Sequence, residues 1–191
     1  SDYVDAKSGV SARMSITAFE NLLSTANRRM LISGESKTSL RMADFLGIIS
    51  ALNGKIELVY EGEQEGAAQI SYHLITQAVK TLFPDFFPEI KKLEKPDEIG
   101  PYDELLGWFF KDNELFLGDT LTDKEYQHLL EGLPGIDTLM QKYQPECKAE
   151  DRYFYIEFLL WGLEAHKKLN KYRTLEGFQF KDSLGSYISK L

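Results

Sequence analysis

Apolar residues recur at helical spacing along most of the chain. The first such segment places five of them on one face, Phe19, Leu22, Leu23, Ala26 and Met30. Thr17 followed by Glu20 is typical of a capping box, so we expect this helix to begin at Thr17 or a turn earlier. Gly34 is expected to end it.

A second helix is predicted after the polar residues 35–39. Asn53-Gly54 is a favoured C-terminal cap for it, and its inward residues would be Leu40, Phe45, Ile48, Ile49 and Leu52. Residues 55–60 then alternate in a way that is typical of a short strand or an extended tail. Two antiparallel helices with an extended exit would form a small unit.

The remainder of the chain also has a helical pattern. Pro84 and Pro88 would close its first helix, the charged residues 89–100 form a loop, and Thr122 with Glu125 is a capping box. The last long helix has an apolar face so wide that it should be buried on more than one side, with Gly162 permitting a close neighbour. The predicted helices cover residues 67–83, 102–110, 123–131, 136–143, 150–170 and 181–190.

These elements predict a mainly α fold with at most one short strand, near residues 55–60. Charge and aromatic content both change at about residue 60. Residues 1–60 carry 7 basic and 6 acidic side chains, whereas residues 61–191 carry 15 and 24, together with 20 of the 24 aromatic residues. We therefore place a boundary at the acidic, glycine-bracketed residues 61–66, between a small helical segment, 1–60, and an acidic, aromatic-rich helical region, 61–191.

Composition excludes several classes of protein. The net charge of −8 argues against nucleic-acid binding, which needs clustered Lys and Arg. The longest apolar run, residues 158–163, is far shorter than a membrane-spanning helix. A single cysteine, Cys147, cannot form an internal disulfide, and no signal peptide is visible. We expect a cytoplasmic protein without a membrane span.

Residues 33–39 resemble a phosphate-binding loop, but incompletely. Such a loop needs a Gly, four residues and then Gly-Lys-Ser or Gly-Lys-Thr, because backbone amides wrap the anion while the Lys reaches the terminal phosphates. Ser36 stands before Lys37 in place of that Gly, and no strand is predicted ahead of it. We interpret the segment as an ordinary turn.

The sequence predicts no metal site and no catalytic set. Glu125 and His128 have the i, i+3 spacing of half a carboxylate-bridged di-metal site, but the other half is missing. His73, His128 and His166 lie in separate predicted helices without a second His at i+4, which favours surface or core histidines. Cys147 has no neighbouring base. The aromatic residues between 153 and 161 lie in an acidic segment, so we interpret them as core or as a partner-docking face.

The N-terminal residues 9–13 are the strongest candidate site. Gly9 allows a tight turn, Ser11 can cap a helix, and Arg13 falls in the first helical turn. Backbone N–H groups and the helix dipole favour an anion at such a turn, and a guanidinium adds a planar fork of donors for phosphate oxygens. The plainer alternative is a surface arginine next to the terminus.

Residues 1–60 resemble the lid of AAA+ ATPases of the MoxR and magnesium-chelatase subunit I group. The likeness is carried by residues 9–13 with the sequence Gly-Val-Ser-Ala-Arg, by Ala26-Asn27-Arg28-Arg29, by Gly34, and by residues 40–45 and 53–56. In that group a Gly-x-Ser-x-Arg segment opens a lid helix. The resemblance implies that Arg13 is the sensor-2 residue, which contacts the terminal phosphates of the nucleotide. It also implies that Ser11 supports the turn and that Asp44 lies at the start of the next lid helix.

The same resemblance implies a role for the whole chain. Ala12 stands where many members of the group have Pro, and residues 61–191 are similar to the C-terminal extension of bacterial chelatase-like ATPases. The chain would be the C-terminal part of a larger ATPase that uses ATP and Mg²⁺, forms a homo-oligomeric ring and remodels an unidentified client. The nucleotide-binding core would precede it, so the chain alone would bind no cofactor and would be inactive. The alternatives are a freestanding helical interaction module and, third, an independent enzyme.

Overall fold

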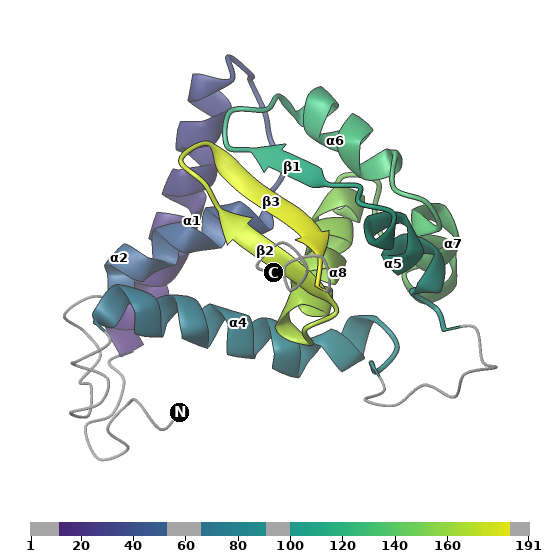
Figure 1. The fold of residues 1–191 in the computed structure, drawn as a ribbon. Helices are drawn as coiled ribbons and strands as arrows, with labels where there is room; N and C mark the ends of the chain where they lie inside the picture. Colours follow the sequence, from purple (N-terminus) through teal and green to yellow (C-terminus); the bar gives the residue numbers. More distant parts are fainter. Residues whose placement is uncertain (1–11, 53–65, 91–99, 184–191) are drawn as a thin grey trace. The chain divides into compact units, whose positions relative to one another are not determined.

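The computed structural model describes residues 12–52, 66–90 and 100–183 of the 191-residue chain. Contacts between Cα atoms divide the chain into two units, residues 1–78 and 79–191, and each is described by itself. The chain is mainly helical, as the sequence predicts, and helix α4 (Ala67–Phe86) contains the boundary between the units (Figure 1). None of the helices in the described ranges is long and apolar enough to cross a membrane.

The N-terminal unit contains helix α1 (Ala12–Ile32), the 3₁₀ helix η1 (Met42–Gly47) and the short helix α2 (Ile48–Leu52). Gly34 follows α1 with a φ of 73°, which confirms it as the residue that ends the helix. The helix begins earlier than Thr17, however, and the Thr17 hydroxyl donates to the carbonyl of Arg13 within it at 3.0 Å. Thr17 is therefore an interior helical residue, and the capping box with Glu20 is wrong.

The two helical segments pack through one narrow face of α1. Leu22 and Ala26 of α1 are buried, whereas Phe19 is 61% exposed and Leu23 41% exposed. Gly47 permits the close approach of η1, because an added Cβ would lie 2.0 Å from the Thr25 hydroxyl oxygen of α1. The predicted second helix is thus a 3₁₀ turn that continues into one short α-helical segment. The predicted cap at residues 53–54 and the strand at 55–60 lie outside the described residues, as do all residues of the predicted boundary at 61–66 except Gly66.

The C-terminal unit combines helices with a small antiparallel sheet (Figure 1). The strand order is β1-β3-β2, with Leu115 opposite Phe180 and Lys171 opposite the same Phe180 on the other side. The predicted capping box of Thr122 and Glu125 is confirmed at the start of α6. The elements are α5 (Asp103–Phe110), β1 (Leu115–Gly118), α6 (Asp123–Glu131), α7 (Ile136–Tyr143), α8 (Arg152–Ala165), β2 (Leu169–Arg173) and β3 (Gly177–Asp182).

Three predicted helix boundaries are wrong in this unit. The helix predicted for residues 150–170 ends at Ala165, because Lys167 has a φ of 61° and the chain then enters β2. Lys181 and Asp182 belong to β3 rather than to a final helix, and residues 184–191 lie outside the described part. Helix α4 continues through Pro84 to Phe86, one turn beyond the predicted end.

Helix α8 forms the centre of the C-terminal core. Its residues from Ile156 to Leu163 are all buried, which confirms the prediction that its apolar face is covered on more than one side. Gly162 makes the predicted close approach, because an added Cβ would lie 2.0 Å from the Phe83 ring. On β3, Phe178 meets Trp161 edge to face with the ring centroids 5.1 Å apart. The helix therefore has packing partners in both α4 and the sheet.

Candidate functional site

Arg13 is the one residue of the predicted phosphate site that the structure describes. It is the second residue of α1, so it lies in the first turn of a 21-residue helix, and it is solvent-exposed. The first-turn N–H groups of a helix lack partners within the helix and carry partial positive charge, which suits this turn to an anion. Gly9 and Ser11, the other two predicted residues, lie outside the described part of the chain.

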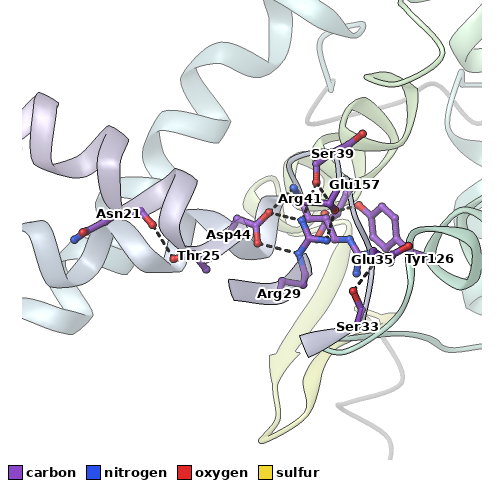
Figure 2. Close-up of polar contacts among 11 residues, drawn as sticks. Asn21, Thr25, Arg29, Ser33, Glu35, Ser39, Arg41, Asp44, Tyr126 and Glu157 are labelled. Carbon is purple, nitrogen blue, oxygen red and sulfur yellow. Dashed lines mark hydrogen bonds and ion pairs between the residues drawn. The ribbon is translucent and has the colours of Figure 1, made fainter. Parts of the chain in front are cut away.

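The other end of α1 is held by a buried ion pair that the sequence analysis missed (Figure 2). Arg29 Nε lies 3.1 Å from Asp44 Oδ1, and Arg29 Nη2 lies 2.8 Å from Asp44 Oδ2, so the contact is bidentate. Arg29 is 7% exposed and Asp44 2% exposed. A fork-to-carboxylate contact of this kind fixes the orientation of both side chains as well as their distance.

Further hydrogen bonds complete this network. Arg29 also donates to the Thr38 hydroxyl at 2.8 Å and to the Ser39 carbonyl at 2.7 Å. The Asp44 carboxylate in turn accepts the backbone N–H of Arg41 at 2.8 Å, next to the first turn of η1. Because α1, residues 38–39 and η1 all bond to the same two side chains, the pair joins these segments.

The network also explains the segment that resembles a phosphate loop. Residues 33–39 follow helix α1 rather than a strand, and the Ser33 hydroxyl donates to the Met30 carbonyl and to the Glu35 carboxylate. Thr38 and Ser39 are occupied as acceptors for Arg29. The segment therefore lacks the preceding strand of a phosphate loop, and four of its residues, Ser33, Glu35, Thr38 and Ser39, bond within the N-terminal unit.

A second polar cluster lies in the C-terminal unit, inside the core around α8. The Tyr126 hydroxyl of α6 donates to Glu157 Oε2 at 2.6 Å, and both side chains are buried (Figure 2). Lys171 of β2 places its ammonium 3.4 Å from the centroid of the Trp161 ring and 2.9 Å from Glu164 Oε2. These contacts tie both α6 and β2 to α8.

Lys171 is the cation of this cluster. Its side chain is fully buried, while Glu164 is 24% exposed. Burial lowers the pKa of Lys171, and the Glu164 carboxylate opposes that shift. A lysine of lowered pKa is a potential nucleophile, but no substrate can reach an amine with no exposed surface. We therefore assign Lys171 a structural role, as a cation held on an aromatic face.

The remaining candidates do not form a site. Across the described ranges, no three His, Cys, Asp or Glu side chains gather so as to hold a metal ion. His73 and His128 are exposed, whereas His166 packs on Phe83 with the ring centroids 5.5 Å apart, and its pKa is lowered by burial and by Lys80. Glu125 belongs to the capping box at the start of α6. Burial raises the pKa of the Cys147 thiol above its usual value.

Of the aromatic residues of α8, Phe158 and Trp161 are packed in the core, whereas residues 153–155 are half-buried. Phe158 lies against Phe83 and Phe86, with ring centroids 6.2 Å and 5.4 Å apart, and Trp161 is buried. This is the core-packing interpretation of the aromatic cluster.

Comparison of the chain with protein-family models, with curated proteins and with solved structures gives no match.

Proposed function

We propose that this chain is the lid and C-terminal region of a chelatase-like AAA+ ATPase, with Arg13 as the sensor-2 arginine. One observation carries the proposal: an exposed arginine lies in the first turn of a long helix, and the other end of that helix is fixed by a buried ion pair. An arginine at a helix N-terminus combines the positive end of the dipole with a fork of donors suited to phosphate oxygens.

The buried pair explains how an event at Arg13 would move more than one side chain. Arg29 and Asp44 join α1 to η1, so a force on the first turn of α1 is transmitted to the following segments rather than lost by bending. Gly47 adds close backbone packing between the same two elements. The N-terminal unit would therefore respond to the nucleotide as a body.

The energy of one contact is sufficient for such a response. A charge-assisted hydrogen bond from Arg13 to a terminal phosphate would contribute about 1.5–3 kcal/mol. A difference of that size shifts a two-state lid equilibrium roughly ten- to a hundredfold. The lid would close while the terminal phosphate is present and would be released after hydrolysis.

The proposal implies what the rest of the protein supplies. A core upstream of this chain would hold ATP and Mg²⁺ and carry the phosphate-binding loop, and the complete cytoplasmic protein would act as a homo-oligomeric ring on a client protein. The chain alone would not hydrolyse ATP. Its C-terminal unit, moved by the lid, would contact the client or a neighbouring subunit.

The test is the ATPase activity of the full-length protein with Arg13→Ala. We expect kcat to fall at least about tenfold, in line with the loss of one charge-assisted contact. Arg28→Ala is the matched control, because Arg28 is exposed on the same helix near its opposite end, and it should leave the rate within twofold. An unchanged rate in Arg13→Ala, or an upstream coding sequence without a phosphate-binding loop, would refute the proposal.

A further inference from the structure

A surface pocket lies between α5 and α7 in the C-terminal unit. Pro101, Glu104 and Leu105 line it from the side of α5, and Thr138, Leu139 and Lys142 line it from α7. Leu105 and Leu139 are buried and form an apolar floor, whereas Glu104, Thr138 and Lys142 are exposed at the rim. The pocket is thus apolar inside and charged at its edges.

Its volume of about 100 Å³ limits what can enter. An apolar cavity of about 150 Å³ accepts one benzene molecule. The pocket between α5 and α7 therefore has room for one aliphatic side chain of the size of leucine, and a larger ring system would not fit.

The two charged groups lie at opposite ends of the pocket. Glu104 stands over the N-terminus of α7, because a Cβ added to Gly135 would lie 2.9 Å from Glu104 Oε2. Lys142 follows Gly135 by seven residues along the same helix, and its ammonium lies 5.1 Å from the centroid of the Tyr143 ring. At 1.5 Å per residue, about 10 Å of helix separates the carboxylate from the base of the lysine side chain.

This spacing distinguishes between the possible ligands. A free amino acid carries its ammonium and carboxylate on one carbon atom, so it cannot meet both ends of the pocket. A helical ligand spans about 10 Å with charges at i and i+7, but it then presents anchor side chains at both i+3 and i+4, and this pocket has room for one aliphatic side chain only. In an extended chain, side chains at i, i+2 and i+4 share one face and span about 13 Å, which flexible charged side chains can match to the pocket.

We propose that this pocket binds an extended peptide segment of a partner protein with a basic, an aliphatic and an acidic residue at alternate positions. The aliphatic side chain enters between Leu105 and Leu139, the basic side chain meets Glu104, and the acidic side chain meets Lys142. The proposal concerns the C-terminal unit alone. It does not depend on Arg13 or on nucleotide, so its test is separate from that of the ATPase.

The experiment is an NMR titration of the ¹⁵N-labelled 191-residue chain with the synthetic peptide Ac-Lys-Ala-Leu-Ala-Glu-NH₂. We expect saturable shifts of the Gly135, Thr138 and Lys142 amide signals, with a Kd on the order of 1 mM because one side chain is anchored. Replacing the peptide Leu by Ala should abolish the shifts. Replacing its Lys and Glu by Gln should weaken binding at least about threefold, as expected for rim ion pairs.

Protein variants locate the binding. Thr138→Trp places an indole over the mouth of the pocket from an exposed position and should abolish the shifts, whereas Gln141→Trp, at an exposed position of α7 outside the lining, should leave them unchanged. Glu104→Gln and Lys142→Gln should each reduce the advantage of the charged peptide over the neutral one. Three outcomes would overturn the proposal. They are the absence of saturable shifts, equal binding of the peptide by Thr138→Trp and by the unaltered chain, and equal binding of the charged peptide and its Gln-substituted, neutral variant.

Discussion

Asp44→Ala isolates the contribution of the buried ion pair in the N-terminal unit. The substitution leaves the Arg29 guanidinium, which is 7% exposed, without its carboxylate. It also removes the acceptor of the Arg41 backbone N–H. The Thr38 and Ser39 acceptors of Arg29 are retained, so the guanidinium loses part of its network and not all of it.

The expected loss in the free energy of unfolding is large for a side chain as small as that of Asp44. Removing one partner of a buried pair destabilises a protein by about 3–5 kcal/mol, because the remaining charge stays desolvated and uncompensated. Replacing both partners by apolar residues of similar volume is often neutral or stabilising. We therefore expect Arg29→Met combined with Asp44→Leu to be more stable than Asp44→Ala alone.

Both tryptophans, Trp108 and Trp161, lie in the C-terminal unit, so tryptophan fluorescence would not report on the N-terminal unit. Native-state hydrogen exchange, which follows individual amides, is the suitable assay. The buried face of α1, at Leu22 and Ala26, should exchange more than about a hundredfold faster in Asp44→Ala, which corresponds to a loss of at least 3 kcal/mol. Glu20→Ala, an exposed change on α1, serves as the control. Equal exchange in the two variants would refute the reasoning.

Two further predictions concern the C-terminal unit. Gly162→Ala should lower the thermal midpoint of unfolding by the equivalent of about 1–3 kcal/mol. The alanine Cβ would lie 2.0 Å from the Phe83 ring, and this overpacking outweighs the better helix propensity of Ala. A raised midpoint would contradict the packing described for α8. Lys171→Met should flatten the pH dependence of the free energy of unfolding below about pH 10.4, the pKa of an unfolded-state lysine. Burial lowers the folded-state pKa of Lys171, so the unfolded chain still holds the proton at pH values where the folded chain has lost it. The contribution of this group to stability therefore rises with pH up to the unfolded-state pKa. Urea unfolding at several pH values measures that slope, and identical slopes in Lys171→Met and the unaltered chain would count against this account.

The helices of the C-terminal unit were predictable because their signals are local. Thr122 and Glu125 are three residues apart, and both halves of their capping box are formed. Gly162 lies in a long apolar helix, where a costly glycine indicates a close neighbour. Such features depend on a few consecutive residues, so the chain pattern is sufficient to find them.

At most one strand is expected from the sequence, near residues 55–60, and the sheet was missed, although β3 carries the alternation of a half-buried strand, with Phe178 and Phe180 buried and Gln179 between them. Strand β2, in contrast, conceals its period. The inward side of β2 includes Leu169 and Lys171, and Lys171 looks polar in the sequence although its side chain is fully buried on Trp161. The alternation of apolar and polar residues that marks a half-buried strand is therefore missing. Only the position of Trp161 on α8 makes a lysine suitable there, and that is tertiary information.

The buried pair of the N-terminal unit left a partial signal. Arg29 follows Leu22 and Ala26 at i+7 and i+3, so it belongs to the buried face of α1, whereas Phe19 and Leu23 lie on the exposed side. A charged residue on an apolar face needs a partner. Asp44 lies 15 residues away, beyond any helical period, and the spacing alone does not select it.

Because the Lys171 amine is buried, its reaction with a chemical reagent reports on opening of the β2–β3 hairpin. An acylating reagent can attack this amine only during the intervals when the hairpin has lifted from the indole beneath it. The acylated side chain is neutral and bulkier, so it cannot return to its place between Trp161 and Glu164. When acylation is faster than reclosing, each opening leaves a covalent mark on this one residue and the marking rate equals the opening rate; when acylation is slower, the rate reports the population of the open form.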